Sequence, residues 1–371
     1  MKFAIITHVP HIIQQNQYFA YAPYVNEINI WSKQVAELII VAPIVNSKKT
    51  AVDSSYIHLR IKFLPIESFN LISFKGILLS LIKIPKISCE IYKAMQSADH
   101  IHLRCPGNIG LLGCLVQIAF PSKPKTAKYA GNWDPKSKQP WSYKLQKWIL
   151  SNTFLTRNMQ VLVYGEWEGS TSNIKPFFTA TYAKSDKKAI RKRDVKDPIN
   201  FVFVGALVVG KNALYAIQLV EGLAQKGYKV SLTLFGDGKE RNRLEQYCFA
   251  NNLENNVIFK GNQTKETVQK AYQDSHFIVL PSKSEGWPKV VAEGMFWGCI
   301  PIATKVSCVP YMLDHGNRGV LLEMILEKDI LQIEKVLNSQ NRYDDMQNKG
   351  VNWSREYTTD AFEVEIKKLL L

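Results

Sequence analysis

The feature that most constrains the fold is a repeated alternation of short apolar runs with longer amphipathic ones. The apolar runs are rich in β-branched residues and read as strands, and a loop and a helical period follow most of them. Because strands that alternate with helices build parallel sheets, the pattern predicts an α/β fold. Ligands bind at the carboxyl ends of such strands, so functional residues are expected in the loops there. The clearest strand-like runs are Lys2–Thr7, Glu37–Ala42, Gln160–Tyr164, Asn200–Val204 and Lys229–Phe235.

The length of the chain favours two domains, because 371 residues exceed what one hydrophobic core usually holds. Residues 184–198 are rich in charge and poor in apolar side chains, which is typical of a linker. We therefore predict an N-terminal parallel α/β domain over 1–183, a basic linker over 184–198 and a C-terminal parallel α/β domain over 199–355. Residues 356–371 are predicted to form a terminal helix, and the N-terminal domain is one candidate for the domain on which it packs.

The net charge of +15 is distributed unevenly. The excess of positive charge lies in residues 1–200, whereas acidic and basic residues balance over 201–371. The first half is therefore expected to face something anionic: a membrane surface, a phosphorylated acceptor or a nucleic acid. Nucleic acid is the least favoured of these partners, because the basic segment at 184–198 has no interleaved aromatic residues.

Residues Phe69–Met95 are the candidate membrane element. On a helix, Lys75, Lys83 and Lys86 fall on one side, and Pro85 should break or kink the helix. The alternative is a helix that covers the sheet and carries solvated lysines. No run has the length needed to cross a bilayer, so the expected location is cytoplasmic or peripheral on the inner face of the cell membrane.

The histidine and cysteine residues give little support to a metal site or a disulfide framework. The six cysteines are scattered without a CxxC spacing, as in proteins of a reducing compartment. His100 and His102 share one strand face near Cys105, but no further ligand follows at a suitable spacing. We expect structural histidines there, and no bound metal.

The stretch with the most candidate functional residues is Ser284–Gly298, SEGWPKVVAEGMFWG. A short apolar strand precedes it, and an apolar face after Pro288 predicts a helix. Glu285 therefore lies in a strand-to-helix loop, and Glu293 lies about two turns inside the helix. The backbone N–H groups of Gly286 to Lys289 would point out of the helix start, where a phosphate or a sugar hydroxyl can bind.

Three further loops follow predicted strands of the second domain and should meet at the same sheet edge. Their glycines would let the backbone approach a ligand closely, Lys211 is a cation suited to a diphosphate, and Glu293 suits the two hydroxyls of a ribose. Together the loops predict a site for a nucleoside diphosphate that carries a sugar. The residues concerned are Gly205, Lys211, Gly236, Asp237, Gly238, Gly261 and Asn262.

These residues resemble successive motifs of the retaining GT-B glycosyltransferases of family 4. The resemblance runs from Phe201 to Leu322 and rests on FVGALVVGKN, LFGDG, VIFKGN and LPSKSEGWPKVVAEGMFWGCIPIAT. It implies a GT-B fold, in which two Rossmann-like, doubly wound parallel-sheet domains face a cleft. It also implies retaining transfer of a sugar from a nucleotide-diphosphate sugar to a hydroxyl acceptor, such as a saccharide or a lipid-linked glycan in cell-surface polysaccharide synthesis.

The resemblance also assigns roles to residues of the donor site. Glu285 would contact the donor sugar, Lys211 would neutralise the leaving diphosphate, and Glu293 would bind the ribose. The loop of Gly286, Trp287, Pro288 and Lys289 would hold sugar hydroxyls and the diphosphate. The family is generally metal-independent and this chain has no DxD sequence, so we expect a nucleotide sugar as substrate and no cofactor.

Residues 1–183 match the family only in their alternating pattern. The family's first-domain histidine has no clear match: Asn132 lies near its expected position, and the other candidates are His8, His11, His100 and His102. The residues predicted for the acceptor side are His8, His11, Asn132 and Trp133. Ala206 stands where family members often carry arginine. The open alternatives are an epimerase or hydrolase of nucleotide sugars, a nucleotide-sugar-binding protein with impaired catalysis, and a basic nucleic-acid binder.

Overall fold

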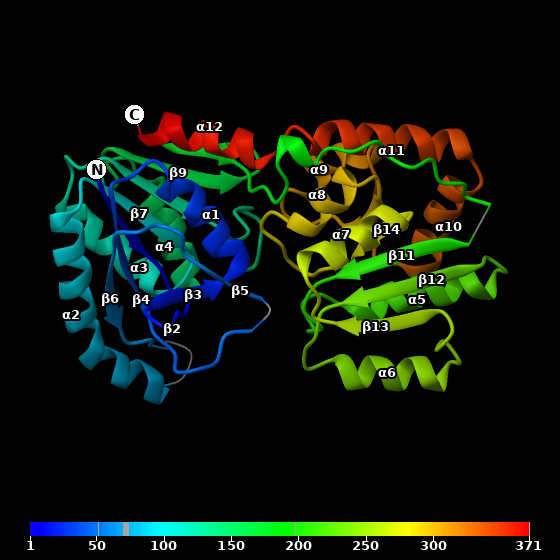
Figure 1. Cartoon of the computed structure of the whole chain (residues 1–371), viewed down its shortest axis with the longest axis horizontal. Helices are drawn as coiled ribbons and strands as arrows, with labels where there is room; N and C mark the ends of the chain where they lie inside the picture. Colours follow the sequence, from blue (N-terminus) through cyan, green and yellow to red (C-terminus); the bar gives the residue numbers. More distant parts are fainter. Residues whose placement is uncertain (51, 70–73, 197, 371) are drawn as a thin grey trace. The chain divides into compact units, whose positions relative to one another are not determined.

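The computed structural model describes residues 1–50, 52–69, 74–196 and 198–370, with side chains for all of these except 74–81. The chain divides into two compact units. Unit 1 comprises Met1–Phe178 and Phe362–Leu371, and unit 2 comprises Thr179–Ala361. Each unit is built around its own parallel sheet (Figure 1), which confirms the predicted α/β class.

The sheet of unit 1 has seven parallel strands in the order β10-β9-β8-β7-β1-β4-β6. The order reverses on either side of β1, so the carboxyl ends of β1 and β7 meet at a topological switch point. The strands are β1 (Lys2–Ile6), β4 (Glu37–Pro43), β6 (Ile61–Ile66), β7 (His100–Cys105), β8 (Lys125–Tyr129), β9 (Met159–Tyr164) and β10 (Ile174–Phe177).

Two strands of a small antiparallel sheet lie between β1 and α1. The sheet consists of β2 (Ile12–Gln14), β3 (Gln17–Tyr21) and β5 (Asp53–Ser55). The turn between β2 and β3 places Gln15 and Asn16 at φ values of 50° and 57°. Two consecutive positive φ angles define the hairpin turn that fits strand twist. The chain has no glycine at this turn, which is why the sequence pattern did not reveal the hairpin.

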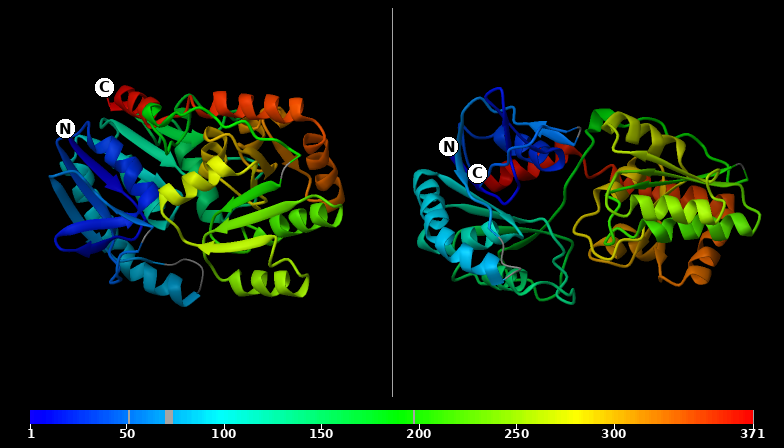
Figure 2. Two further views of the ribbon diagram at one scale, coloured as in Figure 1. Left: turned by 45° about the vertical axis from the view of Figure 1, so that its right-hand side comes forward. Right: turned by 90° about the horizontal axis from the view of Figure 1, so that it is seen from below.

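Five helices belong wholly or mainly to unit 1. They are α1 (Ala22–Ser32), α2 (Phe74–Ser97), α3 (Asn108–Val116), α4 (Trp141–Ser151) and α12 (Thr359–Leu370). Side chains of α2, α3 and α4 share one hydrophobic cluster with the sheet, so these helices cover the same face. A short 3-10 turn, Gln117–Ala119, follows α3. Figure 2 shows the red α12 beside the other elements of unit 1.

The candidate membrane element at Phe69–Met95 corresponds to α2. Residues 70–73 of that element, and the side chain of Lys75, lie outside the described part of the chain. The helix continues through Pro85 to Ser97, so the expected break at this proline is wrong. Ile87 and Ile91 are buried in the core of unit 1, as a helix that covers a sheet requires. Within the described residues, no helix is long and apolar enough to cross a membrane.

Unit 2 repeats the doubly wound design. Its six parallel strands have the order β13-β12-β11-β14-β15-β16, with the switch point between β11 and β14. The strands are β11 (Ile199–Val204), β12 (Val230–Phe235), β13 (Val257–Gly261), β14 (Phe277–Leu280), β15 (Ile300–Thr304) and β16 (Val320–Leu322). The helices are α5 (Ala213–Gln225), α6 (Arg241–Ala250), α7 (Lys265–Asp274), α8 (Lys289–Phe296), α9 (Val309–Met312), α10 (Leu326–Leu337) and α11 (Gln340–Ser354).

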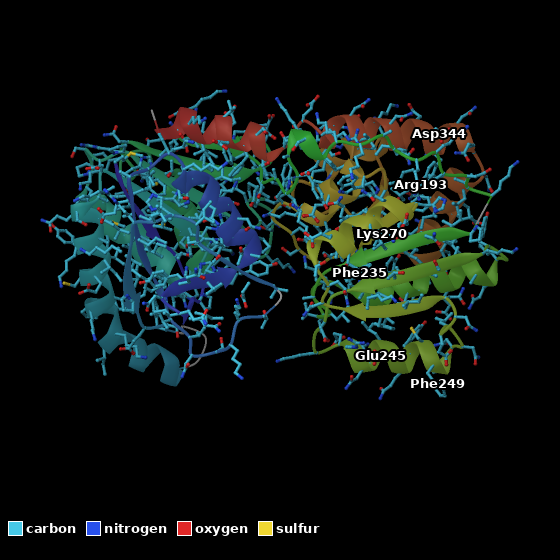
Figure 3. The ribbon with its side chains drawn as sticks, in the orientation of Figure 1. Arg193, Phe235, Glu245, Phe249, Lys270 and Asp344 are labelled. Atoms are coloured by element: carbon cyan, nitrogen blue, oxygen red, sulfur yellow. The ribbon has the colours of Figure 1, made fainter. Side chains whose placement is uncertain are left out.

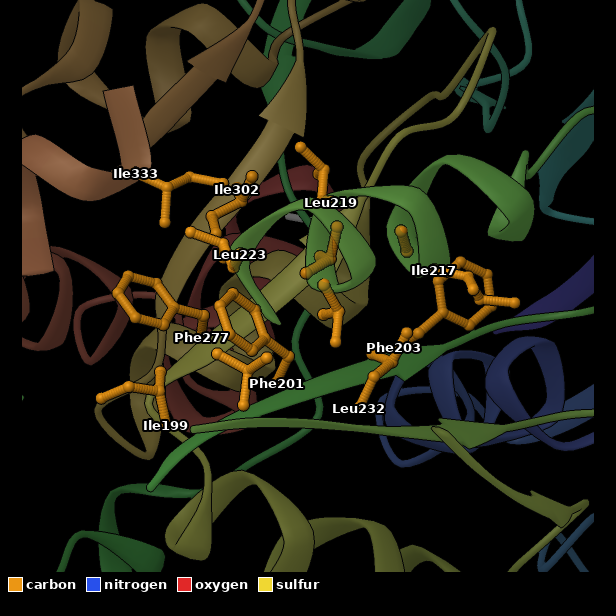
Figure 4. Packing of buried hydrophobic residues seen from close by; sticks show 14 of the residues in the cluster. Ile199, Phe201, Phe203, Ile217, Leu219, Leu223, Leu232, Phe277, Ile302 and Ile333 are labelled. Carbon is orange, nitrogen blue, oxygen red and sulfur yellow. The ribbon is translucent and has the colours of Figure 1, made fainter. Parts of the chain in front are cut away.

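A large apolar core fixes the sheet of unit 2 (Figure 4). Phe201 of β11 and Phe277 of β14 stack with their ring centroids 5.1 Å apart. Both rings are fully or almost fully buried. Because β11 and β14 border the switch point, this contact fixes the spacing of the two strands whose loops form the site described next.

Candidate active site

The loops after β11 and β14 leave the sheet of unit 2 at its switch point. Lys211 lies in the first loop and Glu285 in the second, 74 positions apart in the chain. The backbone N–H of Lys283 donates to the carbonyl oxygen of Gly210 at 2.9 Å, which joins the two loops directly. The doubly wound order therefore brings together two residues that the sequence assigned to one site.

The Lys211 ammonium donates to Oε1 of Glu285 at 2.5 Å. The Glu285 side chain is only 9% exposed, whereas that of Lys211 is 31% exposed. A lysine ammonium carries three protons, so the ion pair leaves Lys211 able to donate further bonds toward solvent. The pair thus presents an oriented cation at the carboxyl edge of the sheet, where an anion can bind.

Glycines bring three loops of this edge into close backbone contact. The N–H of Gly205 donates to Phe235, and the N–H of Gly236 donates to Gly261, each at 2.9 Å. Gly236 has a φ of 130°, and a Cβ atom there would lie 2.0 Å from the carbonyl oxygen of Gly205. A Cβ at Gly238 would lie 2.4 Å from a carbonyl oxygen of the first loop. Only glycine permits this packing of the loops.

The remaining polar residues of these loops lie near Arg241 at the start of α6. Its guanidinium is 3.6 Å from Oδ2 of Asp237 and 2.8 Å from Oε1 of Glu245. A Cβ at Gly261 would lie 3.4 Å from the same guanidinium. Asn262, the next residue in the chain, is exposed. Arg241 is thus a second cation at this edge, and the sequence motifs did not single it out.

The start of α8 differs from the predicted row of backbone donors. Pro288 has no N–H, so it interrupts the run from Gly286 to Lys289. The carbonyl oxygen of Gly286 accepts from Ser307 Oγ and Cys308 Sγ, each at 3.1 Å, which holds the loop against the segment after β15. Trp287 is 7% exposed and stacks on Trp353 with centroids 5.9 Å apart. Little of its ring is left for a sugar to contact.

Glu293 is the fifth residue of α8, about one turn from the helix start rather than two. The Thr181 hydroxyl donates to Oε1 of Glu293 at 2.6 Å, and the Tyr272 hydroxyl donates to Oε2 at 3.1 Å. Burial, followed by the charge of Glu293, raises the pKa of Tyr272 well above its ordinary value. Its hydroxyl therefore stays protonated. Both carboxylate oxygens are oriented by protein hydroxyls that the sequence motifs did not reveal.

Arg193, which is labelled in Figure 3, binds the carboxyl ends of the two helices that carry Tyr272 and Glu293. Its guanidinium donates to the carbonyl oxygens of Tyr272 at 3.1 Å, Gln273 at 2.9 Å and Trp297 at 2.9 Å, and also to that of Gly298. The first two carbonyls close α7, and the last two follow α8. Arg193 belongs to the segment predicted as a solvated linker, yet it is 7% exposed and lies inside unit 2.

The residues predicted for the acceptor side lie in unit 1 and differ in accessibility. His11 is fully buried: its Nε2 lies 2.7 Å from the Tyr56 hydroxyl and its Nδ1 lies 2.8 Å from the Val9 oxygen. Burial lowers the pKa of His11 to about 4. Trp133 is 5% exposed, with its ring packed edge-on against Tyr129.

Asn132 and His8 are the more accessible candidates of unit 1. Asn132 is partly buried, and its Oδ1 accepts from the N–H of Asp134 at 2.9 Å, which fixes the turn after β8. His8 follows β1 and lies against the glycine after β7: a Cβ at Gly107 would come within 2.7 Å of His8 Nδ1. His8 therefore sits at the switch point of this sheet.

His100 and His102 share one hydrogen-bond partner in the core of unit 1. The Thr126 hydroxyl oxygen lies 3.0 Å from Nε2 of His100 and 2.8 Å from Nδ1 of His102. Burial lowers the pKa of His100 to about 4 and, together with the nearby charge of Arg104, that of His102 to about 3. In the described part of the chain, no group of three or more His, Cys, Asp or Glu residues is arranged to hold a metal ion.

Comparison with known proteins finds a family model that is similar to most of the second unit. Residues 185–353 match the family model of glycosyl transferases group 1. Protein CapJ of Staphylococcus aureus is 23% identical over 362 residues, covering 92% of this chain and 88% of CapJ. An uncharacterized glycosyltransferase of Methanocaldococcus jannaschii is 26% identical over 169 residues, which are 45% of this chain and 46% of that protein. The chain thus spans less than half the length of the archaeal relative.

A solved structure resembles this chain over its whole length. The crystal structure of Anabaena HepE in complex with UDP superposes with a TM-score of 0.71 at 13% identity, covering 100% of this chain and 98% of HepE. Identity at this level shows the fold and not the activity. The chain has the GT-B fold predicted from its motifs, and residues 185–353 match the model of glycosyl transferases group 1.

Proposed function

We propose that this protein is a retaining glycosyltransferase that moves a sugar from a nucleotide-diphosphate sugar to a hydroxyl acceptor without a metal. The observation that carries the proposal is the Lys211–Glu285 ion pair at the switch point of unit 2, 2.5 Å long and set among close-packed glycine loops. A doubly wound sheet binds its ligand at this point, and an oriented cation there suits an anionic leaving group.

The proposed reaction breaks the bond between the anomeric carbon and the diphosphate oxygen, and forms a bond from that carbon to the acceptor oxygen. The diphosphate leaves with the bonding electrons and takes the acceptor's proton, so charge and atoms balance. Lys211 stabilises the negative charge that develops on the leaving oxygen, supported by the start of α8. Attack on the side from which the diphosphate departs retains the anomeric configuration.

The donor is proposed to bind unit 2 through separate groups for each of its parts. Glu285 would contact the sugar while it orients Lys211, and Glu293 would accept bonds from the ribose hydroxyls. Each oxygen of Glu293 has lone pairs beyond those used by Thr181 and Tyr272, so it can accept further bonds. The UDP in the HepE crystal structure supports a nucleoside diphosphate as the anchor.

The acceptor is proposed to be a saccharide or a lipid-linked glycan of cell-surface polysaccharide synthesis, bound by unit 1. His8 and Asn132 are the residues best placed to contact it. His11 and Trp133 are buried and would act on the acceptor loops only through packing. The excess positive charge of residues 1–200 supports an acceptor that carries phosphate.

The test is turnover of nucleotide sugars by the wild type, by Glu293→Ala and by the control Glu365→Ala on α12. A thermal-shift screen first identifies the nucleoside diphosphate, since a ligand of the folded state raises its stability. We expect Glu293→Ala to abolish turnover while the fold is retained, and Glu365→Ala to behave as wild type. Undiminished turnover in Glu293→Ala would refute the site. Release of free sugar in the absence of an acceptor would show that the protein is a hydrolase. Formation of an epimer of the donor would show that it is an epimerase.

A further inference from the structure

Helix α4 of unit 1 presents large aromatic side chains to solvent. Trp141 is 62% exposed and Trp148 is 60% exposed, and they lie seven positions apart on one side of the helix. Lys144, between them on the same side, is also exposed. The opposite side packs into the core through Ile149 and Leu150. Tryptophan is normally well buried, so two exposed indoles in one stripe need an explanation.

The apolar character continues beyond the carboxyl end of the helix. Phe154 is 70% exposed, and the guanidinium of Arg157 lies 4.6 Å from the centroid of its ring. The neighbouring helix α3 and the 3-10 turn after it expose Leu115 and Ile118. We call the stripe formed by Trp141, Lys144, Trp148, Phe154 and Arg157 the α4 stripe.

The charged residues of the chain segment that contains the α4 stripe have a single sign. Between Asp134 and Glu166 the sequence contains no acidic residue and five basic ones. The basic residues are Lys136, Lys138, Lys144, Lys147 and Arg157. A surface that joins exposed indole and phenyl rings to cations complements a layer with an apolar interior and anionic headgroups.

We propose that the α4 stripe docks this protein on the surface of an anionic lipid bilayer. The indoles of Trp141 and Trp148 would enter the headgroup region, where their apolar rings and N–H groups are both satisfied. Lys144 and Arg157 would contact lipid phosphates. The exposed aliphatic side chains of Leu115 and Ile118 favour a lipid partner. A single-stranded nucleic acid is bound by cations and stacking rings and has no use for aliphatic side chains. The inference is independent of the proposed transfer reaction.

The test is co-sedimentation of the full chain with vesicles of phosphatidylcholine, with or without phosphatidylglycerol. The test variant is Trp141→Ser/Trp148→Ser. The matched control is Phe249→Ser, which removes a 75% exposed ring from α6 of unit 2 (Figure 3). We expect the wild type and Phe249→Ser to bind anionic vesicles equally, and the double variant to bind about tenfold or more weakly. Lys144→Gln/Arg157→Gln should weaken binding to anionic vesicles only.

Several outcomes would overturn the proposal. One is a wild-type protein that does not sediment with anionic vesicles. Another is a double variant that binds as well as the wild type, with its fold confirmed by circular dichroism. Light scattering that shows a wild-type dimer made monomeric by the double substitution, without vesicle binding, would assign the stripe to a second copy. Binding to single-stranded RNA in place of vesicles, lost in the double variant, would assign it to nucleic acid.

Discussion

The ammonium of Lys211 lies 2.5 Å from Oε1 of Glu285, a carboxylate 74 positions further along the chain. Removing the charge while keeping the length of the side chain, in Lys211→Met, tests the role of this pair. We expect sugar transfer to fall by about 10²–10³-fold, because a preorganised donor to the leaving group is lost. Glu285→Gln should also lower transfer, since the ammonium is then no longer held by a charge.

The control for Lys211→Met is Lys283→Met. Lys283 is exposed and belongs to the same pair of loops, but only its backbone N–H makes the contact with Gly210. Its substitution should leave transfer unchanged. Equal activity in Lys211→Met and Lys283→Met, measured as release of the nucleoside diphosphate, would remove Lys211 from the mechanism.

The glycine loops predict a strong contrast between two Gly→Ala substitutions in unit 2. At Gly236 a Cβ would lie 2.0 Å from a backbone oxygen, at a φ of 130°. At Gly210 a Cβ would meet no atom within 4 Å. We expect Gly236→Ala to lower the free energy of unfolding by about 2–4 kcal/mol, and Gly210→Ala to change it by less than about 0.5 kcal/mol. Urea unfolding measures both, and similar values for the two variants would contradict the geometry.

Two buried histidines of unit 1 predict a loss of stability on mild acidification. The pKa of His100 is about 4 and that of His102 about 3, against an ordinary value of 6.5. Unfolding therefore takes up protons between pH 6.5 and 4, so stability is highest above pH 6.5 and falls as the pH drops. Each histidine contributes about 1 kcal/mol per pH unit in this range.

The pH effect is best measured between pH 6.5 and 5, where ordinary carboxylates do not yet titrate. The double variant His100→Gln/His102→Gln should reduce the dependence of the urea midpoint on pH and leave a smaller slope from His11, whose pKa burial also lowers to about 4. The control His58→Gln changes a histidine that lies outside this buried pair and bonds the backbone oxygen of Arg60 at 3.0 Å. A wild-type slope retained in the double variant would show that other groups cause the loss.

The fold and the proximity of Lys211 to Glu285 could be predicted from the sequence, because both follow from the order of strands and helices along the chain. Apolar runs that alternate with helices specify a parallel sheet, and the doubly wound order then brings the loops after β11 and β14 together. The motifs around these two residues lie within those loops. At this edge of the sheet, the local motifs and the strand order therefore predict the same group of residues.

Contacts between side chains that lie far apart in the sequence could not be predicted from local patterns. Thr181 is 112 positions from Glu293, and no periodicity or turn signal connects them. Trp133 and Trp287 were candidates for contacting ligands, and their burial depends on how helices and loops pack in three dimensions. The exposure of Trp141 and Trp148 was hidden for the same reason, because an amphipathic pattern does not show which rings stay uncovered.

Arg193 gives the sharpest contrast between sequence and structure, and a matched pair of variants tests it. Arg191 and Arg193 lie two positions apart in a segment that reads as solvated. The Arg191 side chain is 80% exposed and 3.4 Å from Asp274, whereas Arg193 is 7% exposed and donates to four backbone carbonyls. Those carbonyls follow or close the helices that carry Tyr272 and Glu293.

We therefore expect Arg193→Ala to lower the free energy of unfolding by about 2–4 kcal/mol, because buried carbonyls lose a charged donor. Arg191→Ala should change it by less than about 0.5 kcal/mol. Since Arg193 acts on Glu293 only through the two helices, its variant should raise the Kd for the nucleoside diphosphate while the folded fraction still binds it. Equal unfolding free energies for the two variants would mean that α7 and α8 are held in place by their apolar packing, without this arginine.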